Sequence, residues 1–215
     1  FRVFFPLGWL CSLVGVSHWL WYYAGLIPTY SGFYHGLFQI QGFELAFAAG
    51  FLMTAMPRFL ETPGARPWEL ALGALLLLSG AVGLYLGDRA WSLGGLLGTL
   101  LLLIVFAGRR FPRRRDNPPP AFVFVAFGLL CGLAGVLLLL WPATAFPQLG
   151  QRLLEQGLLL GLVMAVGSYL GPRLLYGRRE DPLTQEPMAR RRLAVFALGG
   201  LLLGCSFLVE AGGSP

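Results

Sequence analysis

Long apolar runs separated by short polar segments dominate this 215-residue chain. The runs are about 18 to 24 residues long, the length that an α-helix needs to cross about 30 Å of hydrocarbon. Hydrophobic residues make up 56% of the chain and charged residues only 12%, whereas a soluble domain carries about a quarter charged residues. The sequence therefore predicts an all-α fold, a polytopic helical bundle in a lipid bilayer. We expect seven transmembrane helices, over residues 3–27, 35–56, 68–86, 91–107, 121–141, 152–171 and 193–211.

The positions of the basic residues predict the orientation in the membrane. All sixteen are arginine. With seven spans, fourteen arginines fall on one side, and Arg89 and Arg152 fall on the other. Because arginine-rich loops stay in the cytoplasm, we expect a cytoplasmic N-terminus. The net charge of +6 belongs to these loops, so a nucleic-acid partner is not expected.

Two pairs of similar segments indicate an internal repeat. LGWLCSLVGV at residues 7–16 resembles FGLLCGLAGV at 127–136. QGFELAFAAGFLMTAMPRFL at 41–60 resembles QGLLLGLVMAVGSYLGPRLL at 156–175, with Pro-Arg near the end of each. Because proline interrupts helical hydrogen bonding, Pro57 and Pro172 are predicted to end their helices.

The repeat predicts how the chain divides. Residues 1–108 form a first unit of four spans, residues 109–120 form an Arg- and Pro-rich cytoplasmic linker, and residues 121–215 form a second unit. The repeat is parallel, because each complete unit holds an even number of spans. The second unit lacks its fourth span, so we expect the protein to continue past Pro215.

One span carries most of the polar groups that lie inside the apolar runs. His35, Gln39, Gln41 and Glu44 all occur in the second apolar run, and such groups usually face protein, water or a ligand because lipid cannot hydrogen-bond to them. On a helical wheel His35 and Gln39 share a face with small residues, which another helix or a flat cofactor could approach. Gln41 and Glu44 lie on the opposite face, so this span is expected to be central.

Three further polar residues belong to the candidate site. His18 is expected at the depth of Glu44, about 13 Å below the non-cytoplasmic surface, where the two side chains could meet. His35 is expected near that surface, so a haem held by both histidines fits poorly. Glu155 and Gln156 open the sixth span on the same side.

Each of these residues also has a purely structural interpretation. The two histidines could hydrogen-bond to the backbone at a helix end or to a neighbouring helix, and Glu44 could pair with a partner helix. Cys11, Cys131 and Cys205 lie singly in apolar runs, so neither a disulfide framework nor a zinc site is indicated.

Several motifs resemble the NnrS family. They are the opening Phe1-Arg2-Val3-Phe4-Phe5, His35, Gly42-Phe43 and the stretch GFLMTAMP at 50–57. The family comprises multi-span bacterial membrane proteins associated with nitric oxide stress and denitrification and reported to contain haem and copper. Its members usually have about twelve spans, so this chain would be an N-terminal part or a short version. Where members often show His-x-His-Glu, this chain has His35-Gly36-Leu37-Phe38.

Three functions follow from these observations. The first, which the resemblance implies, is a protein of the bacterial inner membrane that binds haem or copper and acts in the nitric oxide response or in respiration. His35, which matches the family motif, and His18 are its candidate ligands. Gln39, Gln41 and Glu44 would support the cofactor site or handle protons. The glycine-rich helices also suit a non-catalytic scaffold, an accessory subunit of a respiratory or photosynthetic complex. The repeat suits, less well, a small-solute transporter. The sequence does not decide whether the protein is an enzyme.

Overall fold

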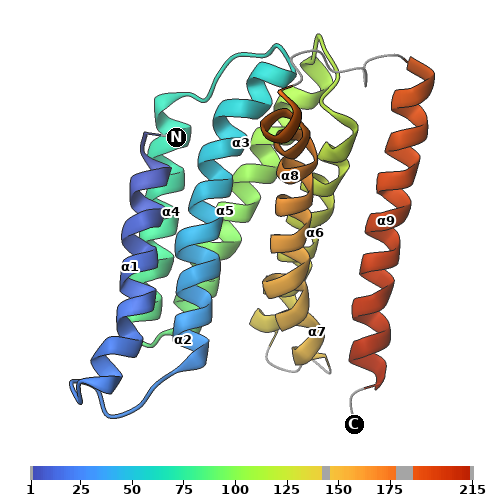
Figure 1. The fold of residues 1–215 in the computed structure, drawn as a ribbon. Coiled ribbons are helices and arrows are strands. Elements are labelled where there is room, and N and C mark those ends of the chain that lie inside the picture. The colour runs from blue at the N-terminus through green and yellow to red at the C-terminus, as the bar shows by residue number, and fades with distance from the viewer. Residues whose placement is uncertain (1, 142–145, 178–185, 214–215) are drawn as a thin grey trace. The chain divides into compact units, whose positions relative to one another are not determined.

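The computed structural model describes residues 2–141, 146–177 and 186–213, and every regular element in these ranges is helical (Figure 1). Seven helical segments of the described chain are long and apolar enough to cross a membrane. The predicted all-α class and the predicted seven spans are therefore confirmed.

Nine α-helices and four shorter helical segments, designated η, make up the described chain. In order, they are α1 (Phe4–Tyr23), α2 (Gly32–Leu37), η1 (Phe38–Glu44), α3 (Leu45–Phe59), α4 (Pro67–Tyr85), α5 (Arg89–Arg110), η2 (Phe111–Arg113), η3 (Pro120–Phe122), α6 (Val123–Leu140), α7 (Pro147–Arg152), η4 (Leu153–Gly157), α8 (Leu158–Tyr176) and α9 (Glu186–Gly213). The segments η1 and η4 are π-helical. They join the α-helices on either side into single continuous spans.

Local signals in the sequence start several of these helices. The Ser31 hydroxyl accepts a hydrogen bond from the Tyr34 N–H (3.1 Å) at the start of α2. The Asp88 carboxylate does the same for the Trp91 N–H (2.9 Å) at the start of α5. Pro67 occupies the first position of α4, where a missing N–H is no disadvantage.

Two helix ends differ from the prediction. The helix that contains Pro57 continues to Phe59, and the helix that contains Pro172 continues to Tyr176. Proline removes one backbone hydrogen bond in the turn before it. Near the end of a helix that loss does not stop the chain from completing a further turn, so the two prolines lie within the last turns instead of ending them.

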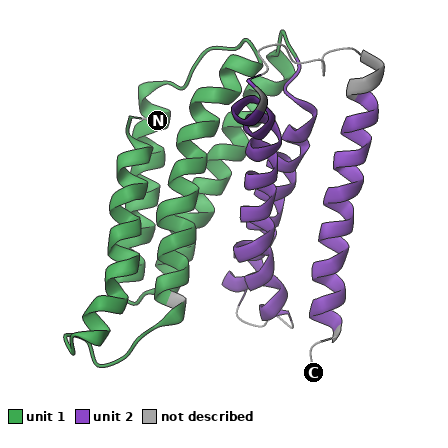
Figure 2. Ribbon diagram, viewed as in Figure 1, with its two compact units in different colours: residues 1–116 green, residues 117–215 purple. Residues whose placement is uncertain are grey.

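The chain forms two compact units, residues 1–116 and 117–215 (Figure 2). The boundary falls inside the segment 109–120 that the composition identified as a linker. Unit 1 holds the first four spans and unit 2 the other three. In unit 1 α1 packs on η1 and α3, and α4 packs on α5, while in unit 2 α6 packs on η4 and α8.

Glycines set the closest helix contacts. A Cβ added to Gly95 would lie 2.6 Å from the Gly80 backbone, and one added to Gly161 would lie 2.6 Å from the Gly128 backbone. The α4–α5 and α6–α8 pairs are therefore in backbone contact, which small residues permit in membrane helices. Many large apolar side chains on the outer helix faces stay exposed, including Leu20, Leu130 and Leu201, as expected of surfaces that meet lipid.

Candidate functional site

The polar residues of the second span lie where its backbone leaves α-helical geometry. The π-helical segment η1 contains Gln39, Gln41 and Glu44, and His35 lies one turn before it. π-Helical turns occur frequently at functional sites. The span is also the most buried of the seven within the described chain, which agrees with the central position expected for it.

His35 has a hydrogen bond that defines the state of its ring. Its Nδ1 lies 2.9 Å from the carbonyl oxygen of Gly15 on α1. A carbonyl oxygen can only accept, so Nδ1 carries the proton and donates it. In the neutral ring Nε2 then carries the lone pair, and a histidine that ligates a metal through Nε2 has this tautomer.

His18 has the opposite arrangement. Its Nε2 accepts a hydrogen bond from the backbone N–H of Ser31 (3.1 Å), so the lone pair of this ring is already engaged. Coordination through Nε2 would require that this bond be broken. The two rings therefore differ in the nitrogen that is hydrogen-bonded, Nδ1 in His35 and Nε2 in His18.

The depth predicted for His18 was wrong. The first helix ends at Tyr23 instead of near Ile27, and the loop that follows returns Ser31 to His18. The His18 ring lies 4.4 Å from that of Tyr34, centroid to centroid. Tyr34 and Glu44 are ten residues apart on one helical span, about 15 Å, so His18 lies at the His35 end and not beside Glu44.

Aromatic rings surround the two histidines. The Tyr30 ring centroid lies 5.5 Å from that of His18 and 6.4 Å from that of His35. Trp19 and Tyr22 lie 5.7 and 6.1 Å from Tyr30. Tyrosine and tryptophan gather at membrane–water interfaces, and this cluster has that composition.

The two glutamines bind different helices. The Gln39 amide donates to the carbonyl of Ser12 on α1 (3.3 Å). Gln41 exchanges two hydrogen bonds with Ser92 on α5: its amide donates to the Ser92 carbonyl (3.1 Å), and its oxygen accepts from the Ser92 hydroxyl (3.0 Å). Gln41 is 1% exposed and Ser92 fully buried, so this pair is part of the core of unit 1.

Glu44 takes no part in these hydrogen bonds. Its Oε2 atom is buried and has no hydrogen-bond partner in the part of the chain that the structure describes. A buried carboxyl oxygen without a partner is unfavourable. Of His35, Gln39, Gln41 and Glu44, only Glu44 has a buried polar atom without a hydrogen-bond partner among the described residues.

The candidate residues of unit 2 make local contacts. Glu155 lies in the second π-helical segment and accepts a hydrogen bond from the Gln151 side chain (2.8 Å). Gln156 is exposed. Arg152 pairs with Glu210 on α9 (2.6 Å). Glu155 and Gln156 are therefore surface groups of unit 2 and are not gathered into a site like that around His35.

Several partners of the site were not predicted from the sequence. Ser12, Gly15, Ser31 and Ser92 each hold one of the predicted polar side chains. Small residues are common in membrane helices and give no individual signal, so only the geometry identifies them. Groups of three or more His, Cys, Asp or Glu arranged to hold a metal ion do not occur within the described ranges.

These observations define a polytopic helical membrane protein with two histidines among aromatic rings at one end of its first four spans. Comparison with known families is consistent with this class: the family model described as NnrS protein matches residues 1–213. The chain belongs to the NnrS family. Neither a curated protein nor a solved structure matches it.

Proposed function

We propose that this NnrS-family protein binds a haem through Nε2 of His35 and acts in the bacterial response to nitric oxide or in respiration. The observation that carries the proposal is the hydrogen bond from His35 Nδ1 to the Gly15 carbonyl. A haem-ligating histidine needs a partner of this kind, because it fixes the ring and makes Nε2 a stronger donor.

The surroundings of His35 suit a flat cofactor. Gly32 and Gly36 lie on the same short helix, and a Cβ added to either would meet nothing within 4 Å. The rings of Tyr30 and Tyr34 both pack against His18. A macrocycle could approach the α2 backbone at these two glycines, close to the aromatic rings.

Haem is preferred to copper because of the number of ligands each needs. A haem would need a single protein ligand, which His35 could supply, and its iron would then be able to bind a diatomic such as nitric oxide. A protein copper site draws on several histidine, cysteine or methionine ligands, and His35 is the one group here with a free lone pair supported by a hydrogen bond. The experiment below also detects the alternative, a copper ion held by His35 together with other residues.

The other polar residues would support this site. Gln39 holds the His35 face against α1, and Ser31 holds His18 beside Tyr34. Glu44 lies nine residues beyond His35, about 13 Å along the helix. We propose that it handles protons at a second position and does not touch the cofactor.

The protein is proposed to lie in the bacterial inner membrane with its N-terminus in the cytoplasm. The arginine distribution supports this orientation. The His35 end of unit 1 would then face the non-cytoplasmic side, where nitric oxide and respiratory substrates from outside the cell arrive first.

The test is spectroscopy and metal analysis on the purified full chain. The wild type should show a haem absorption spectrum and close to one iron per chain, and the His35→Ala variant should lose both. His18→Ala serves as the matched control and should keep most of its haem. Copper in place of iron, lost with both variants, would redirect the proposal to a copper site. A folded wild type without either metal would contradict it.

One observation favours a structural alternative, an accessory subunit of a larger respiratory or photosynthetic complex. His35, Gln39 and Gln41 all bind carbonyl groups of neighbouring helices, and polar side chains of this kind hold membrane helices together. If the wild type lacks a cofactor but copurifies with partner subunits in a fixed ratio, this alternative replaces the haem proposal.

A further inference from the structure

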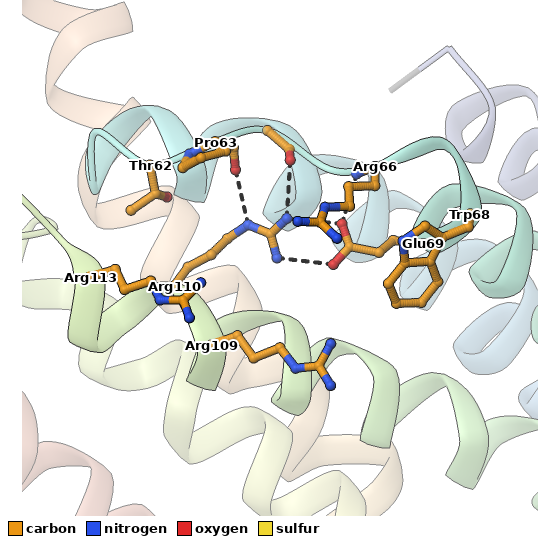
Figure 3. A pocket seen from close by; sticks show the side chains of 9 residues that line it. Thr62, Pro63, Arg66, Trp68, Glu69, Arg109, Arg110 and Arg113 are labelled. Atoms are coloured by element: carbon orange, nitrogen blue, oxygen red, sulfur yellow. Dashed lines mark hydrogen bonds and ion pairs between the residues drawn. The ribbon is translucent and has the colours of Figure 1, made fainter.

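A second polar site lies at the other end of unit 1. The loop that joins α3 to α4 crosses the last turn of α5 and encloses a pocket of about 370 Å³ (Figure 3). Thr62, Pro63 and Gly64 of this loop line it, together with Trp68 and Glu69 of α4. Four arginines complete the lining: Arg66, Arg109, Arg110 and Arg113.

Arg110 lines this pocket, and its guanidinium group is hydrogen-bonded to the protein. Its guanidinium donates to both carboxylate oxygens of Glu69 (2.9 and 3.1 Å). It also donates to the carbonyl oxygens of Pro63 (3.1 Å), Gly64 (3.0 Å) and Phe106 (3.3 Å). These bonds fix the loop onto α5, so the pocket is held in shape by a buried ion pair.

The pocket has a surplus of positive charge. Glu69 is the one acidic residue in its lining, and its charge is already paired with Arg110 and with the Arg66 N–H (2.7 Å). Arg66, Arg109 and Arg113 are exposed. In Figure 3 the Arg66 side chain extends toward the Arg110–Glu69 pair. Three arginine charges at one pocket remain without a carboxylate in the lining to balance them.

A neutral group in the lining also lacks a partner. Thr62 Oγ1 is buried and makes no hydrogen bond within the described chain. A hydroxyl can donate to an anionic oxygen, so Thr62 adds a donor beside the arginines. Both the charge surplus and the unpartnered hydroxyl call for the same kind of ligand, an anion with several oxygen atoms.

We propose that this pocket binds a phosphate group. Guanidinium groups match phosphate oxygens with paired, charge-assisted hydrogen bonds. Trp68 is half exposed at the pocket wall, where an aromatic ring marks the membrane–water boundary. The phosphate could belong to an anionic lipid headgroup, which basic pockets on the cytoplasmic side of membrane proteins bind, or to a soluble phosphate compound. This site is separate from the one around His35 and does not depend on the haem.

The test uses thermal unfolding of the purified full chain in a neutral detergent with two probes. Dioleoylphosphatidylglycerol is compared with dioleoylphosphatidylcholine, and inorganic phosphate is compared with chloride at equal ionic strength. A saturable rise in melting temperature with phosphatidylglycerol alone identifies a lipid headgroup. A rise with inorganic phosphate identifies a soluble source. If the wild type responds to neither probe, the proposal is overturned without any variant.

Two variants of equal charge show whether the pocket is responsible. The Arg109→Gln/Arg113→Gln double variant removes two pocket arginines, and its apparent affinity for the active probe should fall about tenfold or more. The control Arg58→Gln/Arg115→Gln removes two exposed arginines that do not line the pocket and should bind like the wild type. Equal losses in both variants would show general attraction to basic loops and would overturn the proposed site.

Discussion

Two glutamines at corresponding positions of the similar sequence segments, Gln41 and Gln156, have very different surroundings. Gln41 satisfies both ends of its amide on Ser92 and is almost fully buried. Gln156 occupies the corresponding place in the second sequence segment and is exposed. Substituting each glutamine in turn therefore compares the same residue type at a buried and at an exposed position.

Replacing Gln41 by Leu should destabilise the protein. The change leaves the buried Ser92 hydroxyl without its partner, and one such bond in a membrane bundle contributes about 1 kcal/mol. We expect an apparent melting temperature lower by about 2 to 4 °C in detergent. Gln156→Leu should leave the melting temperature unchanged, and an equal drop in both variants would contradict the role given to Gln41.

Glu44 should respond in the opposite way. Its buried Oε2 has no partner among the described residues, so replacing the carboxyl by an apolar group removes a desolvation penalty. We expect Glu44→Leu to melt at or above the wild-type temperature while losing any proton-linked activity. A marked loss of stability would mean that Glu44 has a structural partner, and the proton-handling role would then be abandoned.

At the scale of helices, the two units repeat one packing pattern. Gly42 faces Cys11 in unit 1, and Gly157 faces Cys131 in unit 2. The π-helical segments begin at Phe38 and Leu153, an offset of 115 residues, the same offset that relates the similar sequence segments. This agreement supports the proposed duplication, which remains a prediction.

The two glycine–cysteine contacts should be equally intolerant of a methyl group. A Cβ at Gly42 would lie 2.7 Å from Cys11 Cβ, and one at Gly157 would lie 2.8 Å from Cys131 Cβ. We expect Gly42→Ala and Gly157→Ala each to lower the melting temperature, because the helices must move apart. Gly94→Ala and Gly167→Ala are the controls, since nothing lies within 4 Å of either position.

In these controls alanine should be neutral or slightly stabilising, because it favours the helix more than glycine does. Thermal unfolding monitored by circular dichroism compares all four variants. If Gly42→Ala is as stable as Gly94→Ala, the close α1–η1 contact does not form as described.

The sequence predicted the positions of the helices better than it predicted which residues contact one another. Apolar length located all seven spans, because only a run of about 20 residues can cross the bilayer. The wheel placed His35 and Gln39 on one face, and both do bind α1. The fold of the loop that carries Ser31 back to His18 could not be read from periodicity. Nor could the Arg110–Glu69 pair, whose members are 41 residues apart.

At the scale of the whole molecule, the arginine distribution makes a topological prediction. The segment that contains Asn117 should be cytoplasmic, and the turn at Gly87 should be on the opposite side. A green fluorescent protein fused after Asn117 should fluoresce, and alkaline phosphatase fused after Gly87 should be active. The reverse pattern would show that the protein has the opposite orientation, with the His35 end in the cytoplasm.

The central claim, that Nε2 of His35 is a haem ligand, is tested most directly by restoring the ligand from solution. We would record the absorption spectrum of His35→Gly supplied with haem, before and after adding imidazole. The account predicts a spectrum without the wild-type bands that returns to them as imidazole fills the place of the missing ring. A variant that keeps the wild-type spectrum without imidazole would show that another residue holds the cofactor, and the account would be contradicted.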